Sequence, residues 1–360
     1  MDDLRELMRE LSVAPGIPGH EEEIRAILSK HLKPVVHELR TDGIGNLIAK
    51  KNGVKNTPKV MLAAHMDEVG FLVKSIDNNG FVRLSLGVGF HDPRTLLAQR
   101  LKIHTKNGPI PGYVGSKWAN LSDEEERKKA VDPKDLYLDI GAKRKEEAQD
   151  WGVRIGDPIT FASGFEELRN PDIVLGKGLD DRAGCAVMVD VMKKLANRRH
   201  NATIYAVGTV QEEVGIRGAG VAASQIMPDI AIVLDFPYPG GDIPGIEPHD
   251  LPLKMGDGVA FPLADSTGFL GLLPNTKLVE FLENVAQQNQ IPTQRYTFAN
   301  MGTTDGSEIQ KTGSGVPTAA IAVSGRYLHT PYVMVNIQDI KYVSQLVVAA
   351  LEEIHNFTWP

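Results

Sequence analysis

The segment Val60-Met61-Leu62-Ala63-Ala64 is an apolar run that stops abruptly at the polar residue His65. Short, uninterrupted apolar runs of this kind are typical of β-strands that are buried on both faces of a parallel sheet. Similar runs follow at residues 203–207, 230–234 and 318–323, and apolar residues at helical spacing occupy residues 4–11, 21–32, 182–195, 275–285 and 337–354. Strands that alternate with helices predict an α/β fold, namely an α/β/α sandwich with a largely parallel sheet.

Residues 70–168 interrupt this pattern. Their apolar runs are short and partly alternating, and Asn79-Gly80 and Asn107-Gly108 stand between them. Asn-Gly between such runs is a strong signal for a β-hairpin turn. We therefore predict an inserted β domain over residues 70–168, and a discontinuous sandwich domain formed by residues 1–69 and 169–360.

The composition is that of an ordinary globular protein, and it excludes several classes of function. The 360 residues carry a net charge of -7, so no overall basic surface is present for nucleic acid or for an anionic membrane. The sequence has no apolar run long enough to span a bilayer, and its first residues lack the features of a signal peptide. Cys185 is the only cysteine, which excludes intrachain disulfides and Cys-rich zinc sites. These features predict a cytoplasmic protein without nucleic-acid or membrane partners.

Polar residues follow the predicted strands or precede a predicted helix. They are two histidines and several carboxylates: His65, Asp67, Asp180, Glu212, Glu213, Asp235 and His329. Taken singly, such a histidine is usually a hydrogen-bonded structural residue, and Asp180 is a candidate helix cap. Ligands of open α/β sheets bind beyond the carboxyl ends of the strands, where several carboxylates together would be costly without a cation. The pattern therefore favours a site for Zn²⁺, Co²⁺ or Mn²⁺.

The motifs around these residues resemble those of the co-catalytic metalloaminopeptidases of peptidase family M42, which includes glutamyl and TET aminopeptidases. The segments that carry the resemblance are His65-Met66-Asp67-Glu68-Val69-Gly70, Gly178-Leu179-Asp180-Asp181-Arg182, Val210-Gln211-Glu212-Glu213-Val214-Gly215, Asp235 and Arg326-Tyr327-Leu328-His329-Thr330. They follow the order of the family and span nearly the whole chain. The resemblance implies an α/β/α catalytic domain with a PDZ-like β domain inserted between the first and second metal ligands.

The resemblance also implies a role for each residue of the site. One of two divalent ions, Zn²⁺ or Co²⁺ with Mn²⁺ as the alternative, would be bound by His65, Asp180 and Asp235. The other ion would be bound by Asp180, Glu213 and His329, with Asp180 as the bridge between the two. Glu212 would be the general base for a metal-bridged hydroxide, Asp67 would orient the ring of His65, and a cis peptide bond would follow Asp180. The implied activity is the release of N-terminal amino acids from peptides with a free N-terminus.

Two segments depart from the family pattern. Asp181 stands where many relatives have an asparagine, which places an additional carboxylate beside the predicted metal site. The segment Gly302-Thr303-Thr304-Asp305-Gly306 resembles a Gly-Gly-Thr-Asp segment of the family that lies near the substrate. These departures leave the preferred N-terminal residue open, because the basic candidates for recognising an acidic side chain cannot be placed from sequence: Arg94, Lys254, Arg295 and Arg326.

Other functions remain as alternatives. A metal-dependent deacylase that acts on N-acylated substrates would use the same kind of site. Some family members have been named endoglucanases, but glycosidases use a pair of carboxylates without histidine ligands. An inactive assembly protein is disfavoured because both Glu212 and Glu213 are present. The resemblance further implies that residues 70–168 mediate self-association into a dimer-based homo-oligomer, with a dodecamer as one such assembly.

Overall fold

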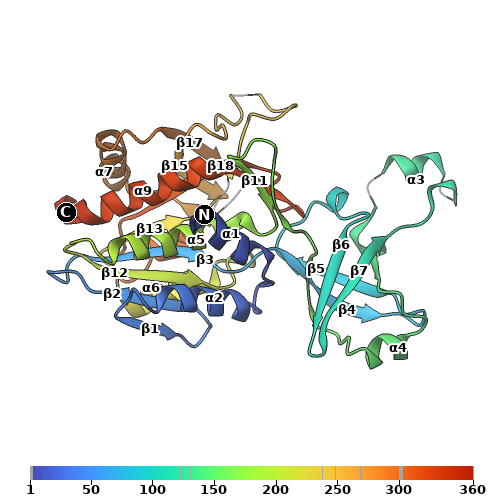
Figure 1. Cartoon of the computed structure of the whole chain (residues 1–360). Helices are drawn as coiled ribbons and strands as arrows, with labels where there is room; N and C mark the ends of the chain where they lie inside the picture. The colour runs from blue at the N-terminus through green and yellow to red at the C-terminus, as the bar shows by residue number, and fades with distance from the viewer. Residues whose placement is uncertain are drawn as a thin grey trace.

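The four predicted buried strands lie side by side and parallel in the middle of one sheet (Figure 1). Their spatial order is β12 (Thr203–Thr209), β3 (Lys59–His65), β13 (Ile230–Leu234) and β18 (Thr318–Arg326). This computed structural model describes residues 3–121, 123–129, 131–236, 238–247, 249–267, 270–299 and 303–359. The central prediction from the apolar runs is therefore confirmed.

Antiparallel strands flank this parallel core, so the sheet is mixed rather than largely parallel. Within the described residues it has thirteen strands. On the side of β12 lie β2 (Leu47–Lys51) and β1 (Glu38–Thr41), and beyond β18 lie β19 (Val333–Asn336), β11 (Ile173–Gly176) and β10 (Phe165–Glu167). The remaining strands are β14 (Tyr238–Pro239), β15 (Val259–Thr267), β16 (Leu270–Leu272) and β17 (Thr293–Ala299). The outer strands β1, β10 and β11 are short, with three or four residues each.

Helices cover both faces of the sheet. One layer contains α1 (Asp3–Val13), α2 (Glu22–Leu32), α5 (Leu179–Leu195), α7 (Thr276–Gln288) and α9 (Ile337–Glu353). The other layer contains α6 (Arg217–Ile226) and α8 (Gly306–Ile309). Successive residues of β3 face opposite layers: Val60 and Leu62 belong to the first core, whereas Met61 and Ala63 belong to the second. The molecule therefore has the α/β sandwich architecture that the sequence predicts.

A closed six-stranded barrel follows β3 in the chain and stands to one side of the sandwich (Figure 1). Its strands are β4 (Gly70–Ile76), β5 (Val82–Val88), β6 (Arg100–Thr105), β7 (Gly108–Gly115), β8 (Tyr137–Asp139) and β9 (Pro158–Phe161). Both predicted hairpins are present, between β4 and β5 and between β6 and β7. Gly80 and Gly108 have positive φ angles of 87° and 113°, which explains the need for glycine at these turns. The barrel has a hydrophobic core of its own, which includes Phe71 and Phe161.

The remaining helices are short and connect the larger elements. They are η1 (Pro93–Thr95), η2 (Ala119–Leu121), α3 (Glu124–Lys128), η3 (Pro133–Asp135), α4 (Lys145–Asp150) and η4 (Ile354–Asn356). Among the described residues, no helix has the length and the apolar character needed to cross a membrane.

Candidate metal centre

Two groups of candidate metal ligands meet at Asp180. His65 is the last residue of β3, Asp235 directly follows β13, and Asp180 lies in the first turn of α5. The ligand atoms of these three residues lie within 4.8 Å of one another, and the same is true of Asp180, Glu213 and His329. All five residues predicted to bind metal therefore lie together at the carboxyl edge of the parallel strands, where open α/β sheets bind their ligands.

Asp180 presents one carboxylate oxygen to each group. Its Oδ1 lies 3.1 Å from Nε2 of His65, and its Oδ2 lies 3.2 Å from Nε2 of His329. Burial raises the pKa of Asp180, but hydrogen bonds from His329 and His65 outweigh burial and hold the pKa below its usual range. Asp180 is therefore an anionic residue shared by both groups, as a carboxylate between two cations would be.

The donor set fits divalent metal ions. Two imidazoles and three carboxylates suit Zn²⁺, Co²⁺ or Mn²⁺. Among the described residues, the buried Oε1 atom of Glu213 has no hydrogen-bond partner. Burial and the nearby charge of Asp180 raise the pKa of Asp235 well above its usual range, and burial raises the pKa of Glu213 to about 7. A cation would give Glu213 the missing partner and would compensate the crowded carboxylates.

Asp67 has a different set of contacts from the predicted one. The ring nitrogen Nδ1 of His65 lies 3.0 Å from the main-chain carbonyl oxygen of Asp67, and 3.7 Å from its carboxylate. The carboxylate instead accepts the backbone N–H groups of Glu212 and Glu213, at 3.1 and 3.0 Å. Asp67 is fully buried. It therefore holds the Glu212–Glu213 peptide with its side chain and contacts the ring of His65 with its main chain.

Glu212 and Glu213 occupy different places although they are neighbours in sequence. They lie in the turn that follows β12, and not in an extended strand. Glu213 belongs to one of the two ligand groups, whereas Glu212 belongs to neither. Burial raises the pKa of Glu212 well above its usual range, although the charge of His65 opposes the shift. A carboxylate beside the ligand groups but outside them is free to exchange a proton with a bound water.

A buried residue behind this turn was not anticipated. The apolar spacing predicts a helix over residues 21–32, but α2 begins at Glu22, and Glu21 directly before it is only 3% exposed. Its Oε1 atom accepts the backbone N–H groups of Gly19 and Gln211, at 2.7 and 3.2 Å. Gln211 has a φ angle of 58°, which an apolar pattern cannot signal. Glu21 thus supports the turn that carries Glu212 and Glu213.

Asp181 ties together three segments that meet at the site. The predicted cis peptide bond between Asp180 and Asp181 is present. The Asp181 carboxylate accepts backbone N–H groups from His65, Gly184 and Phe236, at 3.2, 3.1 and 3.3 Å. An asparagine, with a single acceptor oxygen, could not accept from both sides. The additional carboxylate noted in the sequence is therefore an anchor for β3, α5 and the segment after β13.

Two further buried contacts lie close to the site. Asp305 is 2% exposed, and its carboxylate accepts a hydrogen bond from the hydroxyl group of Thr209. Asp305 belongs to the segment that resembles a family motif near the substrate. Gly302, the first residue of that segment, lies outside the described residues. Lys177 donates to Glu68 at 2.6 Å and to the carbonyl oxygen of Ala14 at 2.8 Å. This buried ion pair joins the chain entering the barrel to the chain leaving it.

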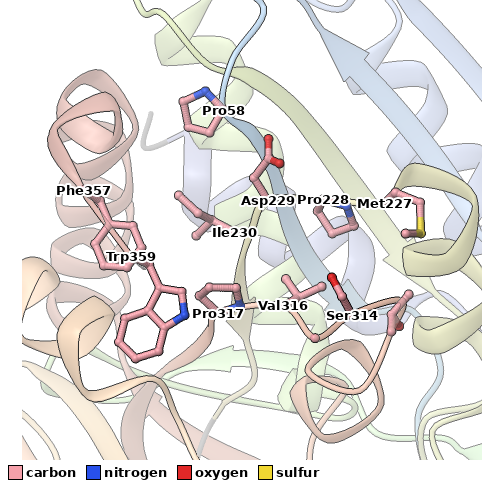
Figure 2. Close-up of a pocket in the computed structure, with 12 residues that line it drawn as sticks. Pro58, Met227, Pro228, Asp229, Ile230, Ser314, Val316, Pro317, Phe357 and Trp359 are labelled. Atoms are coloured by element: carbon pink, nitrogen blue, oxygen red, sulfur yellow. The ribbon is translucent and has the colours of Figure 1, made fainter.

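One hollow of the described residues lies away from this chemistry. It has a volume of about 430 Å³ and is lined by Pro58, Pro228 and Pro317, which stand just before or near the starts of β3, β13 and β18 (Figure 2). Phe357 and Trp359 form another of its walls. Because these residues lie at the amino ends of the strands, the hollow is on the edge of the sheet opposite the ligand groups.

The chain is similar to several known proteins over nearly its whole length. It is 34% identical to the lysyl aminopeptidase of Pyrococcus furiosus, over 97% of each chain. Its structure matches that of a TET aminopeptidase from the marine sediment archaeon Thaumarchaeota archaeon SCGC AB-539-E09, with a TM-score of 0.93 and 35% identity over 98% and 97% of the two chains. It also matches the TET1 peptidase of Pyrococcus horikoshii, with a TM-score of 0.84 and 29% identity over 97% and 99%.

The match to the family is equally extensive. Residues 45–346 match the sequence model of the M42 glutamyl aminopeptidases. This range contains every residue of both ligand groups. The predicted resemblance and the predicted class, a hydrolase that acts on peptides, are confirmed by these similarities. The chain belongs to the M42 glutamyl aminopeptidase family.

Proposed function

We propose that this chain is a dinuclear metal aminopeptidase that releases amino acids from the free N-terminus of peptides. The observation that carries the proposal is the position of Asp180, whose two carboxylate oxygens face two separate groups of candidate ligands. His65 and Asp235 would complete one metal site, and Glu213 and His329 the other. Divalent ions held there would polarise the scissile carbonyl and lower the pKa of a coordinated water.

Glu212 is the proposed general base. Its carboxylate takes a proton from the attacking water, and it returns that proton to the amine as the carbon–nitrogen bond of the peptide breaks. In support, Glu212 lies beside the ligand groups without belonging to either of them. The Asp67 carboxylate holds the backbone N–H groups of Glu212 and Glu213, so that one residue positions both the base and a ligand.

Paired substitutions at Glu212 and Glu213 test these roles. Glu212→Gln keeps the size of the side chain but cannot take a proton, so kcat should fall at least about 10²-fold while both metal ions stay bound. Glu213→Gln should weaken one ion, and excess metal should restore part of the activity. Metal content and kcat are measured on the same samples. Full activity of Glu212→Gln at pH 7 would refute the assignment, and loss of metal only in that variant would reverse the two roles.

The choice of substrates separates this function from its alternatives. The metal-loaded protein is assayed on peptides with a free amine, on the same peptides after N-acetylation, and on cellulosic substrates. An aminopeptidase should cleave only the first set, and a chelator should abolish the cleavage. Cleavage of the acetylated set alone would identify a deacylase. No hydrolysis of any set by protein with two bound ions would support an inactive assembly protein.

We also propose that residues 70–168 contain a separate PDZ-like domain, formed by the barrel strands β4 to β9, that mediates dimer-based self-association, with a dodecamer as the expected assembly; β10 (Phe165–Glu167), at the end of this range, belongs to the sandwich sheet. The closed barrel with its own core supports a separate domain. The TET1 peptidase of Pyrococcus horikoshii assembles into a tetrahedron or a large octahedral shell. Light scattering at micromolar concentration should give a mass several times that of one chain, and a monomer would contradict the proposal.

The buried Cys185 suits a reducing compartment, and the cytoplasm stays the proposed location.

A further inference from the structure

Phe90 is an exposed aromatic residue at the edge of the candidate metal centre. It lies in the loop between β5 and η1, and 72% of it is exposed. Its ring centroid lies 6.4 Å from that of His329, within the range in which aromatic rings interact. Single exposed apolar side chains are common on protein surfaces, so the exposure alone carries no argument.

The residues on both sides of Phe90 are fixed. Gly89 has a φ angle of 86°, and a Cβ atom there would lie 2.6 Å from Cγ1 of Val69. His91 is buried, its Nε2 atom lies 2.9 Å from the carbonyl oxygen of Gly70, and its ring stacks on Phe71 at 4.3 Å. With its neighbours packed against the start of the barrel, the loop has to present Phe90 outward beside His329.

Little room exists for a substrate side chain below the rim. The hollow next to the ligand groups is lined by Val69, Phe161 and Val333, together with Asp180, Glu213 and His329. Its volume is about 10 Å³, which is room for about one water molecule. A side chain of a peptide bound at the metal centre must therefore lie outside this hollow, and the exposed Phe90 ring is one of the surfaces beside His329 that it can contact.

Three of the four basic residues that could select an acidic side chain are already paired with a carboxylate. Arg94, in η1 directly after the Phe90 loop, binds both carboxylate oxygens of Asp92. Arg326 pairs with Asp242, and Arg295 pairs with Glu283. The loop that approaches His329 thus offers an apolar ring and a locally neutral ion pair. Its chemistry fits an uncharged, apolar side chain.

We propose that Phe90 is a specificity-determining residue that forms an apolar wall for a substrate side chain next to the scissile bond. The preferred peptides then carry a large apolar residue at the first or the second position. The inference rests on the proposed aminopeptidase function. Two substrate series distinguish the positions: aminoacyl amides that vary the first residue, and Leu-X dipeptides that vary the second.

The variants are Phe90→Ala and Phe90→Leu, with Ile155→Ala as the control. Ile155 is a 75% exposed apolar residue of the same barrel, in the turn before β9 and away from the ligand groups. Phe90→Ala should lower kcat/KM about 10-fold for substrates with Leu or Phe at the varied position, either in the aminoacyl amides or in the Leu-X dipeptides. Substrates with Gly or Ala at that position should change little. Phe90→Leu should restore most of the loss, and metal content should stay at the wild-type value.

The two substrate series show whether Phe90 contacts the first or the second residue of the peptide. A selective loss in the first series assigns Phe90 to the first residue, and a selective loss in the second assigns it to the second residue. An equal loss on all substrates, or no change on any, overturns the inference. So does the same selective loss in Ile155→Ala. If the wild-type protein with two bound ions cleaves none of these peptides, it is the proposed function that fails, and not the role of Phe90.

Discussion

Replacement of Asp67 by asparagine tests how the site is held together. The two carboxylate oxygens accept one backbone N–H group each, from Glu212 and Glu213. Asparagine keeps the shape but has a single acceptor oxygen, so one N–H group would face the amide NH₂ group instead. The main-chain carbonyl oxygen that contacts His65 is not changed by the substitution. The damage should therefore fall on the turn that carries Glu212 and Glu213, and not on His65.

The size of the effect follows from the contacts. A hydrogen bond to a charged group contributes about 1.5–3 kcal/mol, and the opposed N–H groups are buried because Asp67 is fully buried. If that energy is lost from the positioning of Glu213, the affinity for one metal ion should fall about 10- to 100-fold, as 1.4 kcal/mol corresponds to a factor of ten. The ion held by His65, Asp180 and Asp235 should keep its affinity.

Calorimetric titration of the metal-free variant with Zn²⁺ or Co²⁺ measures both affinities. Asp339→Asn is the matched control, because Asp339 is also fully buried and each of its oxygens accepts one backbone N–H group, from Gly256 and Gly258. The control should lose a similar free energy of unfolding but no metal affinity. Unchanged affinity for both ions in Asp67→Asn would refute the reasoning. Equal loss of metal in both variants would show that general destabilisation is the cause.

Three further predictions follow from buried charges. Lys177→Met should cost about 1.5–3 kcal/mol of unfolding free energy in urea titrations, because buried Glu68 would lose its hydrogen-bonded partner and keep only Arg182, 3.6 Å away; Glu68→Gln in the same chain should recover part of that loss. Burial raises the pKa of the Glu21 carboxyl group from 4.5 to about 7. Its contribution to the free energy of unfolding is therefore complete below pH 4.5 and is lost as the pH rises through 7. In Glu21→Gln, the melting temperature should change less between pH 4.5 and 7 than in the wild-type protein. Asp180→Ala should lose both metal ions, whereas Asp235→Ala should lose only one of them. Elemental analysis of the purified variants measures this.

The parallel centre of the fold and the ligand residues were predictable for the same physical reason. A strand buried on both faces must be apolar along its whole length, so Val60-Met61-Leu62-Ala63-Ala64 is visible in the sequence, and the first polar residue marks its end. His65 and Asp235 directly follow such runs. The antiparallel flank was not predictable in this way. In β1, Glu38–Thr41, no residue is buried, so its position depends on its pairing with β2 rather than on an apolar pattern.

The contacts that hold the ligands were beyond the reach of the sequence pattern. The sequence predicts that Asp67 orients the ring of His65, and Nδ1 of that ring lies 3.0 Å from the carbonyl oxygen of Asp67 and 3.7 Å from its carboxylate. Which oxygen faces the ring depends on the path of the turn after β12, where Gln211 has a positive φ angle. Glu21, which is distant in sequence, supports that path by accepting the backbone N–H group of Gln211.

These contacts explain why so many carboxylates can be buried around one site. Asp67 and Asp181 have no cation as their main partner, and both are held by backbone N–H groups, which satisfy the oxygens without cancelling the charge. If these residues served only to fix the backbone, arginine or lysine partners nearby would be favourable, as in the buried pair of Lys177 and Glu68. Burial raises the pKa of Asp181 well above its usual range, so this region keeps a full negative charge only at a cost in free energy in a medium of low dielectric. Such a region is costly for the metal-free chain and attractive for divalent cations, so the same carboxylates that orient the ligands also strengthen the binding of the metal.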